Sequence, residues 1–145
     1  MTRDIPWVPH GHVLSPLPKA ATTAARRGGT PMGELQGIAR IRFHEGMVDE
    51  FKRLTAQCME IARTQDTGTL QYEVYLNRDE SECVVLERYR DSEALIEHAA
   101  HIGALTESIA ATGAVSGALL GEPSQELRRI MADGSVGLFD LFDAM

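Results

Sequence analysis

Hydrophobic and polar positions follow a regular pattern from residue 35 onward. In residues 35–43, apolar side chains alternate with arginines, which predicts a strand with one buried face. Apolar residues then recur every three or four positions over residues 47–64, which predicts an amphipathic helix. Residues 69–76 alternate again and predict a second strand, which follows the helix after a short turn.

The next predicted strand, residues 82–89, is apolar on both faces. One face carries Val84 and Leu86, and the other carries Cys83, Val85 and Tyr89. A small antiparallel sheet usually exposes one face to water, so a strand of this kind needs a cover on each side. We expect helices on one face and a second copy of the sheet on the other.

The remaining elements complete an α+β order. Asp91 is a suitable N-cap for a second helix, in which Gly103 is a point of breakage or kinking. A strand over residues 114–120, a short helix capped by Ser124 and a final strand over residues 136–142 follow. The first six elements have the order βαββαβ, which predicts a ferredoxin-like four-stranded antiparallel sheet with helices on one face.

Composition narrows the function classes. The chain has 14 lysines and arginines against 21 aspartates and glutamates, and this acidic balance argues against nucleic-acid binding. No apolar run is long enough to span a membrane, so we expect no membrane partner. The two cysteines, Cys58 and Cys83, lie within apolar patterns, which is typical of reduced core thiols in a cytoplasmic protein.

Residues 1–31 differ from the rest of the chain. They hold five of the six prolines, the only tryptophan and an excess of basic residues, with no periodicity. Such a segment lacks a packed core of its own, which predicts a flexible tail, with a transit peptide as the alternative. We therefore expect one folded domain over residues 32–145.

Four stretches, in order and spacing, resemble the antibiotic biosynthesis monooxygenase (ABM) family. They are Ala39–Gly46 on the first strand, Asp66–Tyr72 at the turn into the second, Leu86–Asp91 on the third, and Ala94–His98 on the second helix. The resemblance implies a homodimer in which two sheets form an α/β barrel, with a pocket between sheet and helices in each subunit. Some members oxidise polyketide or quinol substrates with O₂ and no metal, flavin or haem, whereas others degrade haem, isomerise or cleave small metabolites, or have no known activity. For this chain we expect no cofactor.

The sequence departs from two branches of that family. Oxygenases of aromatic polyketides carry a Trp where this chain has Tyr89 and an Asn where it has Val85. Haem-degrading members carry a Trp at the position of His98, and the position of their haem ligand is Ser108 here. These differences argue against haem chemistry and against an Asn-based oxyanion site.

His98 is the candidate catalytic residue. It lies near the apolar stripe of the second helix, where an imidazole can act as a general base or donate to a substrate carbonyl. The alternative is a buried structural histidine. His101 lies three residues further along the helix, and we expect it at the solvent side. The two histidines could bind a metal together with Glu97 or Glu107, but the sequence spacing fixes no third ligand, so we expect no metal.

Four residues are candidates for substrate binding. Tyr72 and Tyr89 offer phenol groups to a pocket, with core aromatics as the alternative. Glu87 shares a face with Val85 and Tyr89, so its carboxylate either pairs with Arg40 or Arg42, as we expect, or has a raised pKa. The resemblance places Val85 at a substrate-facing position.

The sequence therefore predicts an ABM-like enzyme, a cofactor-independent monooxygenase or isomerase. Its substrate would be a small phenolic or quinone-like metabolite, and O₂ a second substrate if it is an oxygenase. The alternative is a non-catalytic dimeric protein that binds a small molecule or serves as an accessory protein. Convergent polar groups around a cavity would favour the enzyme, and a pocket filled by its own side chains would favour the alternative.

Overall fold

The computed structural model describes residues 33–145. The predicted tail at residues 1–31 lies outside the described residues, as does the predicted domain start at Met32. The elements in chain order are β1 (Leu35–Phe43), α1 (Val48–Gln65), β2 (Thr69–Leu76), β3 (Glu82–Tyr89), α2 (Ser92–Ala110), β4 (Gly113–Leu120), α3 (Gln125–Met131) and β5 (Gly137–Phe139).

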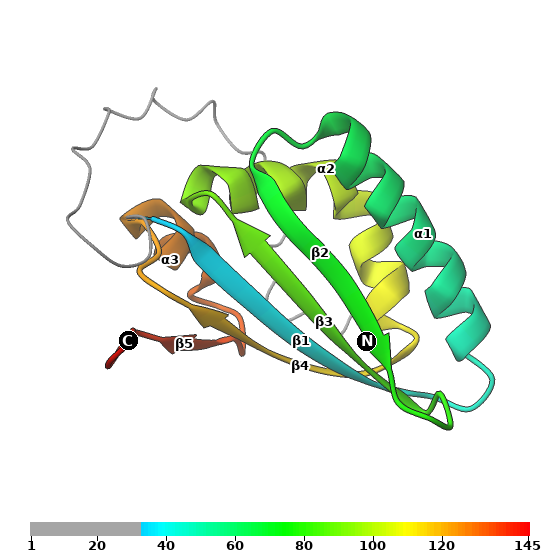
Figure 1. The fold of residues 1–145 in the computed structure, drawn as a ribbon. Helices are drawn as coiled ribbons and strands as arrows, with labels where there is room; N and C mark the ends of the chain where they lie inside the picture. The colour runs from blue at the N-terminus through cyan, green and yellow to red at the C-terminus, as the bar shows by residue number, and fades with distance from the viewer. Residues whose placement is uncertain (1–32) are drawn as a thin grey trace.

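The strands form one mixed sheet in the order β2-β3-β1-β4-β5. The first four are antiparallel to their neighbours, which is the ferredoxin-like arrangement that the sequence predicts. Helices α1 and α2 lie together on one side of this sheet, and α3 lies near the beginning of β1 (Figure 1). The α+β fold class is therefore confirmed.

The predicted last strand, residues 136–142, is shorter than expected. Only Gly137–Phe139 pair, in parallel with Ala118–Leu120 of β4, so the sheet has a fifth, parallel edge strand. Beyond Phe139 the chain leaves the sheet, and the side chain of Phe142 is fully exposed. Apolar composition was a poor guide here, because a strand also needs a neighbour for its backbone groups.

Alternation along the strands sorts side chains between the two faces of the sheet. Ala39 and Ile41 of β1 and Val85 of β3 face the helices, where they pack against Phe51 of α1 in one core cluster. Of the predicted break or kink at Gly103, the break is wrong, because α2 is a single helix through that residue. A helical glycine costs only about 1 kcal/mol relative to alanine and leaves the backbone hydrogen bonds in place.

Local signals at the helix ends are confirmed. The Asp91 carboxylate accepts a hydrogen bond from the backbone N–H of Ala94 at 2.8 Å and caps α2. The Ser124 hydroxyl does the same for the backbone N–H of Leu127 at 3.1 Å and caps α3. These caps fix the ends of the helices that cover the sheet.

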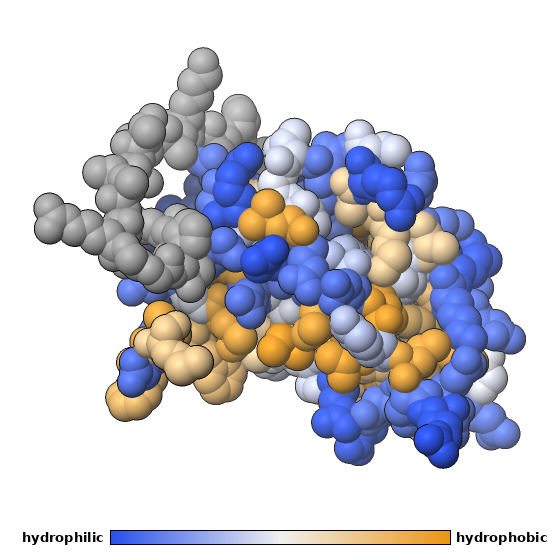
Figure 2. All heavy atoms as spheres, viewed as in Figure 1, coloured by the Kyte–Doolittle hydropathy of each residue, from blue (hydrophilic) through white to orange (hydrophobic). Residues whose placement is uncertain are grey.

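The opposite face of the sheet has no helix over it within residues 33–145. Ile38 is 37% exposed and Tyr75 is 54% exposed on this face. Figure 2 shows apolar side chains gathered along the strands, with charged ones around them. Both cysteines are buried and free, as predicted. Within the described part of the chain, no helix combines the length and apolar character that crossing a membrane requires.

Candidate functional site

A narrow pocket lies between the inner face of the sheet and helices α1 and α2. The empty space in the pocket and at its opening to solvent together amounts to about 430 Å³, so the enclosed part is much smaller. Its lining is largely apolar and consists of Ala39, Ile41, Phe51, Thr55, Tyr72, Val85, Ile102, Thr106, Ile109 and Val115. The lining side chains include three hydroxyl groups and no charged group, so the pocket suits an uncharged ligand.

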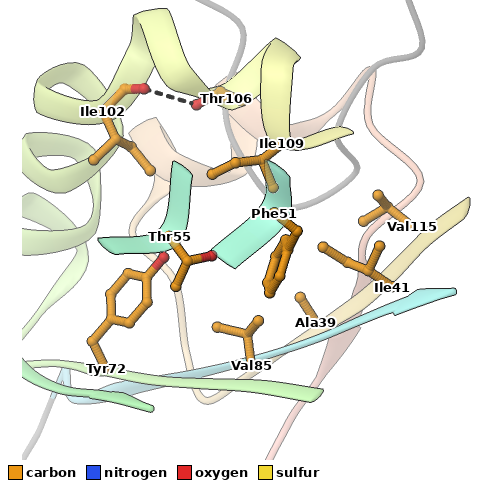
Figure 3. Close-up of a pocket in the computed structure, with 10 residues that line it drawn as sticks. All are labelled: Ala39, Ile41, Phe51, Thr55, Tyr72, Val85, Ile102, Thr106, Ile109 and Val115. Atoms are coloured by element: carbon orange, nitrogen blue, oxygen red, sulfur yellow. Dashed lines mark hydrogen bonds between the residues drawn. The ribbon is translucent and has the colours of Figure 1, made fainter. Parts of the chain in front are cut away.

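Tyr72 provides the aromatic end of this pocket. Figure 3 shows its ring rising from β2 with the hydroxyl directed toward Thr55 of α1. On its other side, the ring meets the imidazole of His98 edge to face, with centroids 5.7 Å apart. Burial raises the pKa of Tyr72 well above its usual value, and the charges of Glu87 and other neighbours add to the shift. The hydroxyl therefore stays neutral.

Behind Tyr72 lies a buried polar cluster built around Asp66. Asp66 is the C-cap residue of α1, and its two carboxylate oxygens face α2. Oδ2 lies 2.6 Å from Nδ1 of His98, and Oδ1 lies 2.6 Å from Nδ1 of His101. The Thr69 hydroxyl donates a further hydrogen bond to Oδ2 at 2.7 Å. One carboxylate thus joins the end of α1 to β2 and to two turns of α2.

Asp66 is ionised over the whole physiological range. Burial opposes its charge, but the hydrogen bonds from His98, His101 and Thr69 outweigh burial and lower the pKa of Asp66 to about 2. A carboxylate can only accept, so His98 presents a protonated Nδ1 to it. In the neutral imidazole, Nε2 then carries a free lone pair on the side of the ring facing away from Asp66.

Nε2 of His98 faces Glu87 of β3. The nearest carboxyl oxygen, Oε1, lies 3.8 Å away, and both side chains are almost fully buried. The pKa of Glu87 is raised to about 8, mainly by burial; an interaction with the Tyr89 hydroxyl opposes part of this shift, and the charge of Asp66 adds a smaller contribution to it. Glu87 is therefore mainly a neutral carboxylic acid at pH 7 and can hold or donate a proton.

Tyr89 completes the cluster on the far side of His98. Its ring lies 5.5 Å from the imidazole, centroid to centroid, so His98 is held between two tyrosines. Burial raises the pKa of Tyr89 well above its usual value, and Glu87 adds to the shift. Tyr89 is completely buried, and its hydroxyl is a neutral donor and acceptor.

The structure brings all five predicted site residues into one region but divides them between two places. Tyr72 and Val85 line the pocket. Glu87, Tyr89 and His98 form the adjoining polar cluster, with Tyr72 at the boundary between the two. The prediction that Glu87 shares the face of Val85 and Tyr89 is confirmed, because all three are buried on the helix-facing side of β3.

Two predicted contacts are wrong. Arg40 and Arg42 do not pair with Glu87; both bind Glu82, which lies on the exposed face of β3. The physical reason is parity, since both arginines alternate with the buried residues of β1 and point away from Glu87.

His101 is also not simply at the solvent side. Its side chain is 27% exposed, and its ring is fixed on Asp66. Glu97, considered above as a metal ligand, instead accepts hydrogen bonds from the backbone N–H and hydroxyl of Thr67. Within residues 33–145, no group of three or more His, Cys, Asp or Glu side chains is arranged to hold a metal ion.

Sequence reasoning missed Asp66. The Asp66-Thr67-Gly68 segment is explained by its position at the end of a helix, which hides a second role for the carboxylate. The available signal was the His98–His101 pair three residues apart on one helix, which needs a common partner when buried. That partner lies more than 30 residues away in sequence, beyond the reach of local spacing.

The fold and this site define a ferredoxin-like α+β protein with a carboxylate–histidine cluster beside an apolar pocket. Residues 37–105, which include most of β1, all of α1, β2 and β3, and most of α2, match the family described as antibiotic biosynthesis monooxygenase, ABM. This match confirms the resemblance to the ABM family over that part of the chain. A search of functionally curated proteins finds no match.

Solved structures with the same fold include three that illustrate its range. MupZ from Pseudomonas fluorescens is 19% identical, with a TM-score of 0.68 over 78% of this chain and 93% of its own. Rv0793 from Mycobacterium tuberculosis is 23% identical, with a TM-score of 0.56 over 64% and 98%. SnoaB, a cofactor-independent oxygenase from Streptomyces nogalater, is 16% identical, with a TM-score of 0.55 over 63% and 95%.

Proposed function

We propose that this protein is a cofactor-independent monooxygenase, or an isomerase, of the ABM type that acts on a small phenolic or quinone-like metabolite. The observation that carries the proposal is the buried His98, whose Nδ1 is fixed by Asp66 and whose Nε2 has no hydrogen-bond partner within residues 33–145. A base with one nitrogen anchored and the other available is the arrangement that general-base catalysis requires.

In this proposal Asp66 is a positioning residue. It selects the His98 tautomer with hydrogen on Nδ1, and it stabilises the imidazolium that forms when Nε2 takes a proton. The neutral Glu87 carboxyl lies on the same side as Nε2 and can return a proton at a later step. Tyr72 and Val85 hold the body of the substrate in the pocket.

Deprotonation by His98 would prepare the substrate to reduce O₂ directly. In the oxygenase form of the reaction, an acidic methylene group beside a phenol is converted to a carbonyl group. One oxygen atom of O₂ enters the product, and the other leaves as water together with the two hydrogens of the methylene. The four electrons come from the substrate and reduce O₂, so the balance requires no further reductant. An isomerase would use the same base and return the proton to another carbon.

The apolar lining favours a second candidate function, a protein that binds a small molecule without transforming it. The pocket is narrow, and His98 and Glu87 lie behind Tyr72 rather than on its wall. Family members related by fold differ widely in chemistry, so the fold by itself does not decide between the two candidates.

Oxygen consumption with a panel of quinols and anthrone-like phenols tests the enzyme. We expect His98→Gln to lower turnover by 10²–10⁴-fold, the usual contribution of a general base. His44→Gln is the matched control, because His44 is exposed in the turn between β1 and α1. Compounds that bind without turnover in the unmodified protein would favour the binding function. Equal turnover in both variants would remove His98 from the mechanism.

We also propose that the protein is a homodimer that buries the open face of its sheet. The support is the apolar character of β3 on that face, where Val84 and Leu86 lie between Ile38 of β1 and Tyr75 of β2. Light scattering at micromolar concentration checks this, and a monomer mass would contradict it. Ile38→Asp should shift the mass toward the monomer, because a buried unpaired charge is costly.

A further inference from the structure

Three buried polar atoms beside the base lack hydrogen-bond partners within the described part of the chain. They are Nε2 of His98, Oε1 of Glu87 and the hydroxyl oxygen of Tyr89, the last of which interacts with the Glu87 carboxyl but forms no hydrogen bond of normal geometry. The three residues are 0%, 3% and 0% exposed. Buried polar groups are nearly always paired, because an unpaired group keeps the full cost of leaving water. Nε2 and Oε1 face each other, and Tyr89 contacts both His98 and Glu87, so the three groups indicate a site that binds a polar group.

The spacing of Nε2 of His98 and Oε1 of Glu87 fits a single oxygen atom. Nε2 and Oε1 are 3.8 Å apart, too far for a direct hydrogen bond. An oxygen atom at about 2.8 Å from each, off the line between them, hydrogen-bonds to both. Gly37 lies opposite Glu87 in the β1–β3 pair, so β1 places no side chain against this carboxyl group.

The donors and acceptors decide which oxygen fits. Nε2 of the neutral imidazole is an acceptor, since Nδ1 donates to Asp66. The carboxylic acid of Glu87 and the phenol of Tyr89 are both able to donate. A carbonyl oxygen accepts only and would leave Nε2 unpaired, while a carboxylate would bring a further charge close to Asp66. A hydroxyl group both donates and accepts.

We propose that Glu87, Tyr89 and His98 form a buried binding site for one neutral hydroxyl group. The hydroxyl donates to Nε2 of His98 and accepts from Glu87 and Tyr89. This inference rests on the proposed function, because it names the end of the substrate that the base meets, a phenol or enol. A water molecule offers the same chemistry, so the test has an arm for each source.

Tyr72 controls the approach to this site from the pocket. Its ring lines the pocket on one side and contacts His98 on the other. A hydroxyl carried by a pocket ligand therefore has to pass the Tyr72 ring to reach Nε2. A phenol with an alkyl tail keeps its apolar part among the apolar lining residues.

The experiment compares three probes that differ at one end. We would titrate the full chain with 4-propylphenol, 4-propylanisole and 4-propylbenzoate and follow the ¹⁵N shifts of the histidine side chains. The phenol should bind at least about tenfold more tightly than the anisole, which cannot donate, and should move Nε2 of His98. The benzoate should bind most weakly of the three.

Two variants and one control assign the effect to this site. Tyr89→Phe removes the phenol hydroxyl, and Glu87→Gln replaces the carboxylic acid by an amide; both keep the size of the side chain. Each variant should reduce the preference for phenol over anisole several-fold. Tyr75→Phe is the matched control, because Tyr75 lies on the opposite face and its hydroxyl donates to Glu73. The control should retain the full preference.

The outcomes separate this site from the proposed function. Phenol preference at His98 without oxygen uptake or isomerisation supports the site and rejects the enzyme. No phenol preference, together with a long-lived water detected by nuclear Overhauser contact with His98, supports the site and rejects a phenolic substrate. Equal binding of phenol and anisole with no such water overturns the inference, as does a Tyr75→Phe variant that loses the preference with the other two.

Discussion

Two glutamates on one strand differ in burial and in the direction in which their pKa values are shifted. Glu82 and Glu87 both belong to β3, five residues apart, and therefore point to opposite faces of the sheet. Glu82 lies on the open face, and hydrogen bonds from Arg40 and Arg42 lower the pKa of its carboxyl. Glu87 lies under the helices, and burial raises the pKa of its carboxyl to about 8.

The contrast shows that position, rather than residue type, determines what a carboxyl group can do. Glu82 is a surface ion pair that water already stabilises, so its chemistry is inert. Glu87 can act as a proton donor at neutral pH, because burial favours the neutral carboxylic acid over the charged carboxylate. The parity of the strand separates the two carboxyl groups, and the helices packed on one face decide which of them is buried.

The largest effect should come from the group that holds the buried cluster together. Asp66→Ala leaves Nδ1 of His98 and Nδ1 of His101 without an acceptor in and near the core. We expect a loss of about 3–5 kcal/mol in the free energy of unfolding, measured by urea at pH 7. Glu82→Ala on the open face should move the urea midpoint very little; similar shifts for the two variants would contradict the contrast.

A smaller effect separates the two glutamates by pH. The pKa of Glu87 is raised on folding, so the folded state binds more protons than the unfolded state between about pH 5 and 8. Its contribution to stability is therefore present below pH 4.5 and is lost as the pH rises toward 8. Glu87→Gln removes this dependence.

Relative to the unmodified protein, the Glu87→Gln variant should gain about 2–4 kcal/mol between pH 5 and pH 8, at about 1.4 kcal/mol for each pKa unit. Urea unfolding at a series of pH values measures this gain. Glu82→Gln should show no such trend, because Glu82 is ionised throughout this range. Parallel stability curves for Glu87→Gln and the unmodified protein would mean that Glu87 is already charged.

The smallest effect belongs to the surface ion pairs. Arg42→Ala leaves Glu82 with Arg40 as its partner, and all three groups remain in contact with water. We expect the melting temperature and the rate of turnover to stay within error of the unmodified protein. A fall of more than about 5 °C in the melting temperature would show that the open face depends on this pair.

The sequence predicted the fold well because its signals are local. Spacing within a few residues was enough to predict three features: the bounds of β1, the helix caps at Asp91 and Ser124, and the shared face of Glu87 and Tyr89. Gly103 was misjudged because a glycine lowers helix propensity without removing a hydrogen bond.

The candidate site was only partly accessible to the same reasoning. His98 could be chosen from its place on α2, but Asp66 could not, because their contact joins residues 32 positions apart. The pairing of Arg40 was misassigned because the parity of Arg40 on β1, which places it on the open face with Glu82, was not applied to its partner. Long-range pairing is information that periodicity does not contain.

The alternation of β3 also bears on how the chain avoids folding incorrectly. A shift of one residue in the register of β3 would turn Glu87 and Tyr89 outward and drive Arg88 beneath the helices. An arginine cannot lose its charge as Glu87 does, so the shifted pairing would bury an unneutralised cation. Burial of Glu87 in the correct register is tolerated because its carboxyl is neutral. Burial of Arg88 in the shifted register is costly because its charge remains. This difference in cost favours accurate pairing of β3, a second benefit of placing an ionisable group in the core.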